Sequence, residues 1–172
     1  IESLGIKTVM ITGDNQKTAE AIAKQAGISH VVASVMPEGK VKEIIKLQET
    51  YGLVAMVGDG INDAPSLKQA NVGIAIGTGT DIAIESSDIT LINDNLDTVL
   101  KAITLSKAIF VKIKQNYFWA WFYNALAIPF AMLGLLHPMI GAFAMSLSSL
   151  NVIYNSLRLK KINLNKFMEE RV

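Results

Sequence analysis

The residues best suited to chemistry form one acidic loop, residues 58–63, with the sequence Gly-Asp-Gly-Ile-Asn-Asp. The apolar run 53–57 before this loop is long enough for a buried strand, and a helical pattern begins at Asn62. Ligands commonly bind at the carboxyl ends of strands in a parallel sheet. Asp59 and Asp63 would suit a hard cation such as Mg²⁺, which can bridge a carboxylate loop and a phosphate group.

The same residue types also occur in ordinary turns, because Gly, Asp and Asn favour turn conformations. On the residues of this loop alone, a turn without a ligand remains an alternative to the Mg²⁺ site. A calcium-binding EF-hand loop is excluded, since Ile61 and Ala64 stand where that pattern needs Asp or Asn and then Gly.

Apolar runs and helical patterns alternate along the first half of the chain. The pattern predicts strands at 7–11, 31–35, 53–57, 72–76 and 89–92, and helices at 16–25, 40–51 and 62–70. Strands and helices that alternate at this length are typical of an α/β fold with a parallel sheet, right-handed crossovers and helices on both faces. The loops 12–15, 58–63 and 77–81 are then expected to share one edge of the sheet.

The second half of the chain carries no Asp, Glu, Lys or Arg between Gln115 and Leu157. A helical pattern starts near Asp97, and two apolar spans, about 115–136 and 139–158, each have about the length of a bilayer-crossing helix. The turn between them would be His137-Pro138. Basic residues flank both ends of this hairpin, so the positive-inside rule places the soluble part and the C-terminus in the cytoplasm. These basic residues are Lys107, Lys112, Lys114, Arg158, Lys160 and Lys161.

These patterns divide the chain into a soluble α/β segment at 1–107, a transmembrane hairpin at 108–161 and a short polar tail at 162–172. The alternative for the hairpin is a pair of helices buried in a soluble protein. The net charge of +1 gives no indication of nucleic-acid binding, and the absence of cysteine excludes disulfides and thiolate metal sites within this stretch. Because the chain opens at Ile1, in a pattern typical of a helix end, we expect a fragment of a longer polypeptide.

Four motifs and the hairpin, taken together, resemble the P-type ATPases, cation pumps whose phosphorylation domain has the haloacid-dehalogenase fold. The motifs are Thr12-Gly13-Asp14, Pro37 with Lys40, the run 58–65 and the run 77–81. In the two spans, Tyr123-Asn124 and Met145-Ser146-Leu147-Ser148-Ser149 resemble the copper(I)-transporting members of the heavy-metal branch. The resemblance covers almost the whole chain. It implies part of a haloacid-dehalogenase-like, Rossmannoid domain followed by two membrane helices.

The resemblance also implies roles for the residues of the loops. Thr12 and Lys40 would hold the phosphoryl group, Asp59 would ligate Mg²⁺, and Asn62 and Asp63 would support that site. A hydroxyl donor, an ammonium group and a carboxylate-held metal suit phosphoryl transfer, which depends on positioning and charge neutralisation. Without the motifs, Lys40 would be interpreted as a solvated helix lysine and Thr12 as a turn or cap residue. The expected catalytic set is Thr12, Gly13, Asp14, Lys40, Asn62 and Asp63, with Asp59 and Asp63 binding the cofactor.

The two spans would carry the transported ion. Asn124 and Ser149 each lie roughly 13 Å along their helices from the cytoplasmic ends, and Met145 is one turn from Ser149. With Tyr123, these residues form the expected Cu(I) ligands, because a thioether is a soft ligand and no acid is present to hold a hard ion. Silver(I) shares this preference. The alternative is that Met145 fills a packing gap and that Asn124 and Ser149 link the helices by hydrogen bonds.

The resemblance implies an ATP-driven copper(I) export pump that forms an aspartyl-phosphate intermediate. The family's Asp-Lys-Thr-Gly-Thr motif is missing from this chain, so the chain alone is expected to be inactive. Its expected partners are the remainder of the pump, namely the actuator and nucleotide-binding domains and the earlier membrane helices, together with lipid and a copper chaperone. ATP would bind mainly to the missing domains. Two alternatives are a membrane-tethered phosphatase of the same fold and a non-enzymatic membrane-anchored module.

Overall fold

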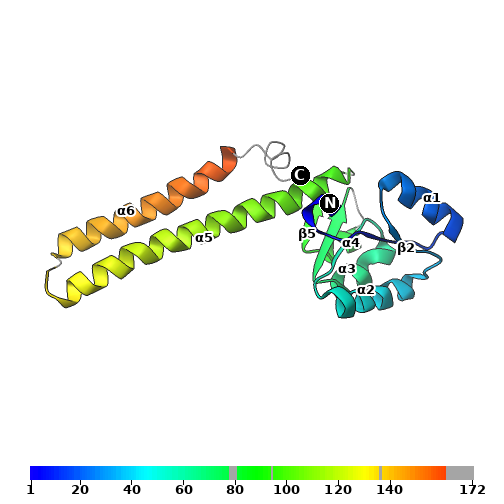
Figure 1. Ribbon diagram of the computed structural model, residues 1–172, viewed down its shortest axis with the longest axis horizontal. Helices are drawn as coiled ribbons and strands as arrows, with labels where there is room; N and C mark the ends of the chain where they lie inside the picture. Colours follow the sequence, from blue (N-terminus) through cyan, green and yellow to red (C-terminus); the bar gives the residue numbers. More distant parts are fainter. Residues whose placement is uncertain (78–80, 94, 136, 162–172) are drawn as a thin grey trace. The chain divides into compact units, whose positions relative to one another are not determined.

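The computed structural model describes residues 1–77, 81–93, 95–135 and 137–161 (Figure 1). The chain divides into two compact units, residues 1–100 and 101–172, and the division lies within one long helix. The first unit alternates strands with helices, as predicted. Its elements are η1 (Glu2–Leu4), β1 (Val9–Ile11), α1 (Gln16–Ala26), β2 (His30–Val32), α2 (Pro37–Tyr51), β3 (Ala55–Gly58), η2 (Ile61–Asp63), α3 (Ala64–Gln69), β4 (Val72–Ile76), α4 (Asp81–Glu85) and β5 (Ile89–Leu91).

All strand pairs in the first unit are parallel, but the strands form two sheets where the sequence predicted one. β1 pairs with β2, and β3, β4 and β5 form the second sheet in that order. Among the described residues, β1 and β3 are not hydrogen-bonded to each other, so each keeps one edge without a strand partner. The difference arises because apolar periodicity identifies strands without identifying which strands pair.

Local sequence signals explain where the helices begin and end. Asn15 caps α1, since its side-chain oxygen accepts a hydrogen bond from the Thr18 amide, and Gly27 ends the helix in the left-handed conformation with φ 69°. Pro37 starts α2 earlier than predicted, because the fixed φ of proline suits the first helical turn. The predicted strand 31–35 is shorter than expected, since β2 ends before Ser34, which has a φ of 56°.

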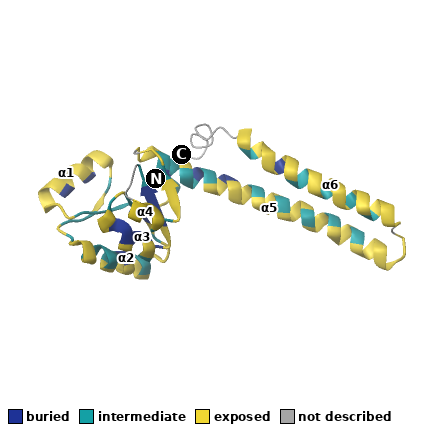
Figure 2. Ribbon diagram, turned by 180° about the vertical axis from the view of Figure 1, so that it is seen from behind, coloured by how far each residue is buried: buried dark blue, intermediate teal, exposed yellow. Residues whose placement is uncertain are grey.

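The core of the first unit packs helices α2, α3 and α4 against the β3 sheet (Figure 2). Its buried members are Ile44, Met56, Leu67, Ala70 and Ala83, with Ile11 and Val54 packed against them. Because Ile11 belongs to β1, this core also joins the two sheets. The loops that follow the carboxyl ends of β1 and β3 carry candidate site residues.

The second unit is built on two helices, α5 (Asp97–Met132) and α6 (Pro138–Leu157), with a short η3 (Arg158–Lys161) at the end. α5 begins where predicted and contains Pro129 without ending there. His137 caps α6, because its Nδ1 accepts a hydrogen bond from the Met139 amide at 3.3 Å. α6 runs back alongside α5 in both ribbon views (Figures 1 and 2).

The sequence predicted that α5 and α6 cross a membrane. Within the described ranges, no helix combines the length and the apolar character that such a crossing requires. The uncharged stretch contains Trp, Tyr, Asn and Ser side chains, whose polar atoms lower its hydropathy relative to a purely aliphatic helix. Two further predictions, the tail at 162–172 and the centre of the 77–81 loop, lie outside the described residues.

Candidate phosphate and metal sites

Thr12 and Asp14 bond to each other in the loop that follows β1. The Thr12 hydroxyl donates to Asp14 Oδ2 at 2.9 Å and accepts from the Asp14 backbone N–H at 3.1 Å. The chain after β2 returns to the same loop: the Ser34 amide donates to the Asp14 carbonyl at 2.7 Å, and the Val35 amide to the Thr12 carbonyl at 3.0 Å. Thr12 is therefore held by backbone bonds on one side, and its hydroxyl lies next to a carboxylate.

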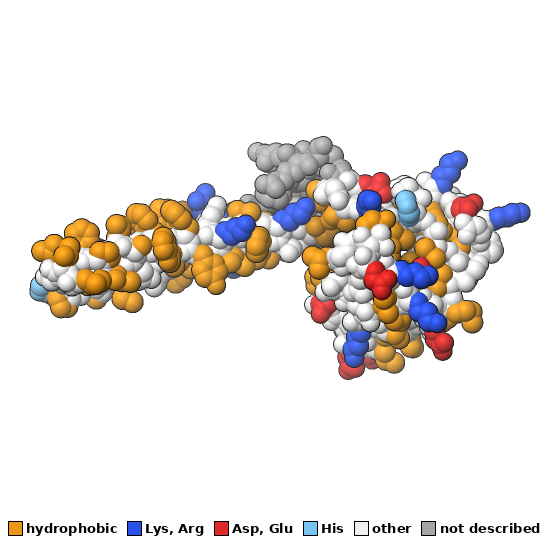
Figure 3. Space-filling view, turned by 60° about the horizontal axis from the view of Figure 1, so that its bottom comes forward, with side chains coloured by type: hydrophobic (Ala, Val, Ile, Leu, Met, Phe, Trp, Pro, Cys, Tyr) orange, Lys and Arg blue, Asp and Glu red, His pale blue; other side chains and the backbone are white. Residues whose placement is uncertain are grey.

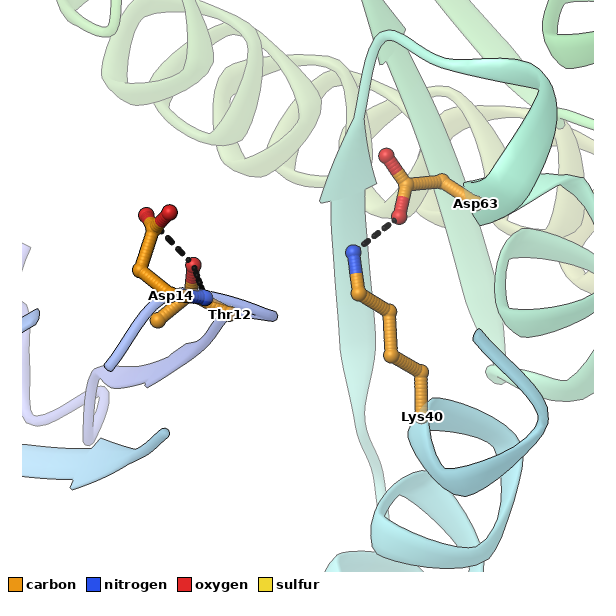
Figure 4. A network of polar contacts seen from close by, with 4 residues as sticks. All are labelled: Thr12, Asp14, Lys40 and Asp63. Carbon is orange, nitrogen blue, oxygen red and sulfur yellow. Dashed lines mark hydrogen bonds and ion pairs between the residues drawn. The ribbon is translucent and has the colours of Figure 1, made fainter. Parts of the chain in front are cut away.

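Lys40 and Asp63 form an ion pair between the first turn of α2 and the end of η2 (Figure 4). The distance from Lys40 Nζ to Asp63 Oδ1 is 2.7 Å, and only 8% of Asp63 is exposed. Charge-assisted hydrogen bonds of this kind are shorter and stronger than neutral ones, and partial burial reduces their screening. The pair therefore fixes an ammonium group beside the acidic loop at the carboxyl end of β3.

Asp63 can take this position because residue 58 has no side chain. A Cβ atom at Gly58 would lie 2.8 Å from Asp63 Cβ and 3.0 Å from both Cγ and Oδ2, distances that packed atoms do not tolerate. Gly60 differs, since a Cβ there would lie 3.6 Å from Asp63 Oδ2, an ordinary contact. The sequence marked Gly58 as part of a motif but gave no sign of this contact. Ser34 carried no signal in the sequence at all.

Asp59 and Asn62 are exposed, and their side chains have no hydrogen bond or ion pair among the described residues. Asn62 lines a shallow groove between the start of α2 and the η2–α3 segment, together with Pro37, Glu38, Val41, Ile61 and Pro65. Asp59 is therefore a carboxylate that is free to bind a cation, directly after β3. Its neighbour Asp63 uses Oδ1 for Lys40 and keeps Oδ2 without a salt-bridge partner.

This donor set fits Mg²⁺ held jointly with a phosphate. In the part of the chain that the structure describes, no three His, Cys, Asp or Glu side chains lie close enough to enclose a metal by themselves. Mg²⁺ usually takes one or two carboxylates and completes its shell with water and phosphate oxygens. Asp59, with Asp63 behind it, supplies that limited set, whereas a protein-only metal cage would need more ligands.

The predicted phosphate-site residues thus form two pairs, Thr12 with Asp14 and Lys40 with Asp63 (Figure 4). No hydrogen bond or ion pair joins one pair to the other within the described ranges. Both pairs follow the carboxyl ends of parallel strands, the edge of a parallel sheet at which ligands commonly bind.

The four predicted Cu(I) ligands are less closely associated. Asn124 donates to the Ala120 carbonyl at 2.9 Å and Ser149 to the Met145 carbonyl at 3.1 Å, so both polar side chains bond within their own helix. Met145 is 68% exposed. The Tyr123 ring packs against Trp119 and Phe122 on α5, with centroid distances of 6.4 and 6.3 Å. Among the described residues, no hydrogen bond joins these ligands across the two helices.

Comparison with known proteins gives a consistent pattern. Two family models, both described as haloacid dehalogenase-like hydrolases, match residues 1–71 and 40–103. The chain is 54% identical to a copper-exporting P-type ATPase of Bacillus subtilis (strain 168) over 94% of its own length, and to one of Staphylococcus aureus (strain JH9) over 95%. It covers only 20% of either relative. The crystal structure of a zinc-transporting PIB-type ATPase in the E2.Pi state matches 92% of this chain with a TM-score of 0.84 and 39% identity, over 26% of that protein.

Proposed function

Because this chain belongs to the P-type ATPases, we propose that it is the C-terminal part of an ATP-driven pump that exports copper(I). The chain spans about one fifth of the length of its curated relatives, so the activity belongs to a larger protein. The observation that carries the proposal is the Lys40–Asp63 ion pair beside the free Asp59 carboxylate, at the carboxyl end of β3. This chain would supply the second segment of the phosphorylation domain and the last two membrane helices.

In the proposed phosphate site, the Thr12 hydroxyl and the Lys40 ammonium contact the phosphoryl oxygens. Gly13 and Asp14 complete the Thr12 loop, and Asn62 lies on the acidic loop next to Asp63. Asp59, supported by Asp63, would hold Mg²⁺. The metal, when bound, would neutralise charge on the phosphoryl group. The protein groups contribute positioning, which accounts for much of phosphoryl-transfer catalysis.

The aspartate that becomes phosphorylated would come from the remainder of the pump. β1 and β3 each have an edge without a strand partner, and the core residue Ile11 links their two sheets. A parallel strand inserted between β1 and β3 would pair both edges and join the sheets. Its carboxyl end would then lie between the Thr12–Asp14 pair and the Lys40–Asp63 pair. A strand that ends in the family's Asp-Lys-Thr-Gly-Thr motif would present its aspartate there.

The hairpin of α5 and α6 is proposed to lie in the membrane with both ends in the cytoplasm. Many of its large apolar side chains are exposed, and hydrophobic groups cover much of its visible surface (Figure 3). Burying them against lipid and against the earlier helices of the pump would remove this surface from water. The actuator and nucleotide-binding domains, and a copper chaperone, are the further partners that we propose.

Copper(I) is preferred over zinc as the transported ion. The hairpin offers the Met145 thioether, the Asn124 amide, the Tyr123 phenol and the Ser149 hydroxyl, and the stretch 115–157 contains no carboxylate. A soft monovalent ion suits thioether coordination without a charged oxygen ligand, whereas a divalent ion would be poorly neutralised here. Silver(I) has the same preference and is the natural second substrate. The exposed side of Met145 leaves room for ligands from other helices of the pump.

The test uses the intact pump with Met145→Ala and Asn124→Ala, and with Met139→Ala as the matched control on the same helix. Met139 is similarly exposed and lies outside the proposed site. Each site variant should abolish Cu(I)-stimulated ATPase activity but still be phosphorylated by inorganic phosphate, because the phosphate site is unchanged. The control should keep full stimulation. Retained Cu(I) stimulation in both site variants would exclude these residues as ligands.

A further inference from the structure

A network of polar side chains joins the middle of α5 to the C-terminal end of α6. Lys112 Nζ donates to Asn155 Oδ1 at 2.9 Å and to Gln115 Oε1 at 3.2 Å. The Asn155 amide donates to Asn116 Oδ1 at 2.8 Å and to Gln115 Oε1 at 3.3 Å. Asn116 in turn donates to the Ser156 hydroxyl at 2.9 Å. Four of these five hydrogen bonds connect α5 with α6, and the Lys112–Gln115 bond lies within α5.

Asn155 is the centre of this network. It is the buried residue of α6, with 9% of its surface exposed. An Asn side chain has two donors and one acceptor oxygen, and here both N–H groups donate and the oxygen accepts from an ammonium. If α6 shifted along or rotated against α5, the buried Asn155 amide would lose several hydrogen bonds at once. These bonds therefore strongly favour the observed position of Asn155.

The network fixes the axial register of the hairpin. The bond between Asn116 and Ser156 places these two residues at the same height along the antiparallel helices. A residue of α5 a given distance from Asn116 toward the hairpin turn is then level with the α6 residue at the same distance from Ser156 toward that turn. Asn124 lies roughly 12 Å of helix beyond Asn116, and Ser148 lies the same distance before Ser156. The proposed metal ligands Tyr123 and Asn124 are therefore level with Ser148 and Ser149. A slip by one helical turn, about 5.4 Å, would break every bond of the network that joins α5 to α6.

The network also fixes how α6 is rotated. Ala144, Ser148 and Asn151 are half-buried and lie at helical spacing on the side of α6 that carries Asn155. Met145 follows Ala144 and Ser149 follows Ser148 in the sequence, and both Met145 and Ser149 are exposed. With Asn155 anchored, the Met145 thioether is directed past the edge of α5, where ligands from other helices would have to meet it.

We propose that Asn155 is a positioning residue for the copper(I) site: its amide sets the axial and rotational register of α6 against α5, and so the placement of Met145 and Ser149 relative to Asn124. The metal-site part of this inference rests on the proposed function. The register itself does not, and it can be measured without any metal.

The first experiment measures register by cross-linking in the intact pump. Ala127→Cys on α5 is combined in turn with Gly141→Cys, Ala144→Cys or Ser148→Cys on α6, and a short bis-maleimide joins the thiols. This stretch has no native cysteine, and mass spectrometry of the joined peptides excludes thiols elsewhere in the pump. Ala127 is nearly level with Ala144, so the 127–144 product should predominate. Asn155→Leu should remove this preference, whereas Asn151→Leu, the control whose amide has no hydrogen bond among the described residues, should keep it.

The second experiment measures the Cu(I) concentration for half-maximal ATPase activity in the same two variants. Groups that orient metal ligands typically change metal affinity by about tenfold or more when they are lost. Asn155→Leu should therefore raise this concentration by about tenfold while phosphorylation by inorganic phosphate stays at the wild-type level. A residue needed only for folding would lower both activities together.

Lys112→Met provides a second variant that leaves α6 unaltered and is used if Asn155→Leu fails to fold. It removes the ammonium group that donates to Asn155 Oδ1. Like Asn155→Leu, it should weaken the preference for the 127–144 cross-link and raise the Cu(I) concentration for half-maximal ATPase activity. Unchanged cross-linking and unchanged Cu(I) dependence in the folded variants would overturn the proposal. If wild-type protein shows no Cu(I) stimulation, the proposed function fails, and the cross-linking result still decides the register.

Discussion

At the scale of single residues, the proposed phosphate site depends on the absence of a side chain at Gly58. Gly58 leaves the space in which the Asp63 carboxylate meets Lys40, and the contact is too short for any Cβ atom. The Lys40 ammonium, the Asp63 carboxylate and the end of β3 therefore form one packed unit. A change at Gly58 would therefore reach Lys40 through Asp63.

Gly58→Ala should move the Asp63 carboxylate and weaken its bond to Lys40. Overpacking of this kind costs about 1–3 kcal/mol of stability, and a displacement of about 1 Å in a positioning group can lower the rate by roughly 100-fold. Phosphoenzyme formation from ATP in the intact pump measures the effect. Gly60→Ala is the control and should be nearly neutral, because its Cβ makes an ordinary contact. In an Asp63→Ala background the Gly58 effect should largely disappear, and a fully additive effect would contradict this account.

Asp59→Asn should impair Mg²⁺-dependent phosphorylation of the intact pump, because an amide is a much weaker ligand for a hard cation than a carboxylate. Loss of even an indirect partner lowers metal affinity by roughly tenfold or more, so the Mg²⁺ concentration for half-maximal phosphorylation should rise at least that much. Asp81→Asn, at the start of α4, is the matched control. Wild-type phosphorylation with unchanged Mg²⁺ dependence would remove Asp59 from the proposed site.

The sequence identified most single residues of the candidate site but not how they contact one another. Thr12, Lys40 and Asp63 were found because each belongs to a motif whose residue types suit phosphate chemistry. The Lys40–Asp63 bond and the Gly58–Asp63 contact depend on distances between segments that periodicity does not encode. Ser34 escaped notice because its backbone conformation is imposed by the return of the chain to the Thr12 loop.

At the scale of elements, the short helix α3, which follows the acidic loop, packs tightly against β4. α3 lies so close to β4 that a Cβ atom at Gly73 would be 2.6 Å from the Leu67 carbonyl oxygen. Ser66 on the same helix is fully buried, and its hydroxyl has no hydrogen-bond partner among the described residues. Burying a hydroxyl group that makes no hydrogen bond lowers the stability of the folded protein.

Ser66→Ala should therefore leave the protein equally stable or make it more stable, by up to about 1 kcal/mol, since alanine also has the higher helix propensity. The thermal unfolding midpoint of the intact protein measures this. Ser87→Ala is the matched control, because the Ser87 hydroxyl donates to the Ile84 carbonyl at 2.9 Å and its loss should be neutral to slightly destabilising. A clear loss of stability in Ser66→Ala would mean that this hydroxyl has a partner in the assembled pump.

Element types were predictable from the sequence, and their ends less so. β4 occupies the predicted residues 72–76, because a β-branched run between turn residues specifies a strand directly. The predicted helix 62–70 begins instead as the short η2 (Ile61–Asp63) and continues as α3, because short 3-10 turns are frequent at helix N-termini. The membrane location of the hairpin is a proposal. Apolar periodicity predicts that a segment is helical, but it does not predict whether lipid or protein surrounds that helix.

At the scale of the whole molecule, the two sheets of the first unit lack a common strand. In the intact pump, a strand between β1 and β3 should protect the backbone amides on their facing edges from hydrogen exchange. In the chain of residues 1–172 alone, those amides should exchange faster. β4 provides the internal control, because β3 and β5 already flank it in this chain. Equal exchange of β1 and β3 in both proteins would argue against an inserted strand.

The Lys40–Asp63 pair would also couple the binding of phosphate to the binding of a metal ion at the proposed site. In the proposed site, the Lys40 ammonium would contact the phosphate, and the Asp63 carboxylate would support the metal ion. A phosphate that draws Lys40 away leaves Asp63 with an uncompensated negative charge, which raises its affinity for a cation, and the reverse holds equally. By thermodynamic linkage, the two species are expected to assist each other's binding by the same factor. When neither phosphate nor metal is bound, the charges of Lys40 and Asp63 compensate each other.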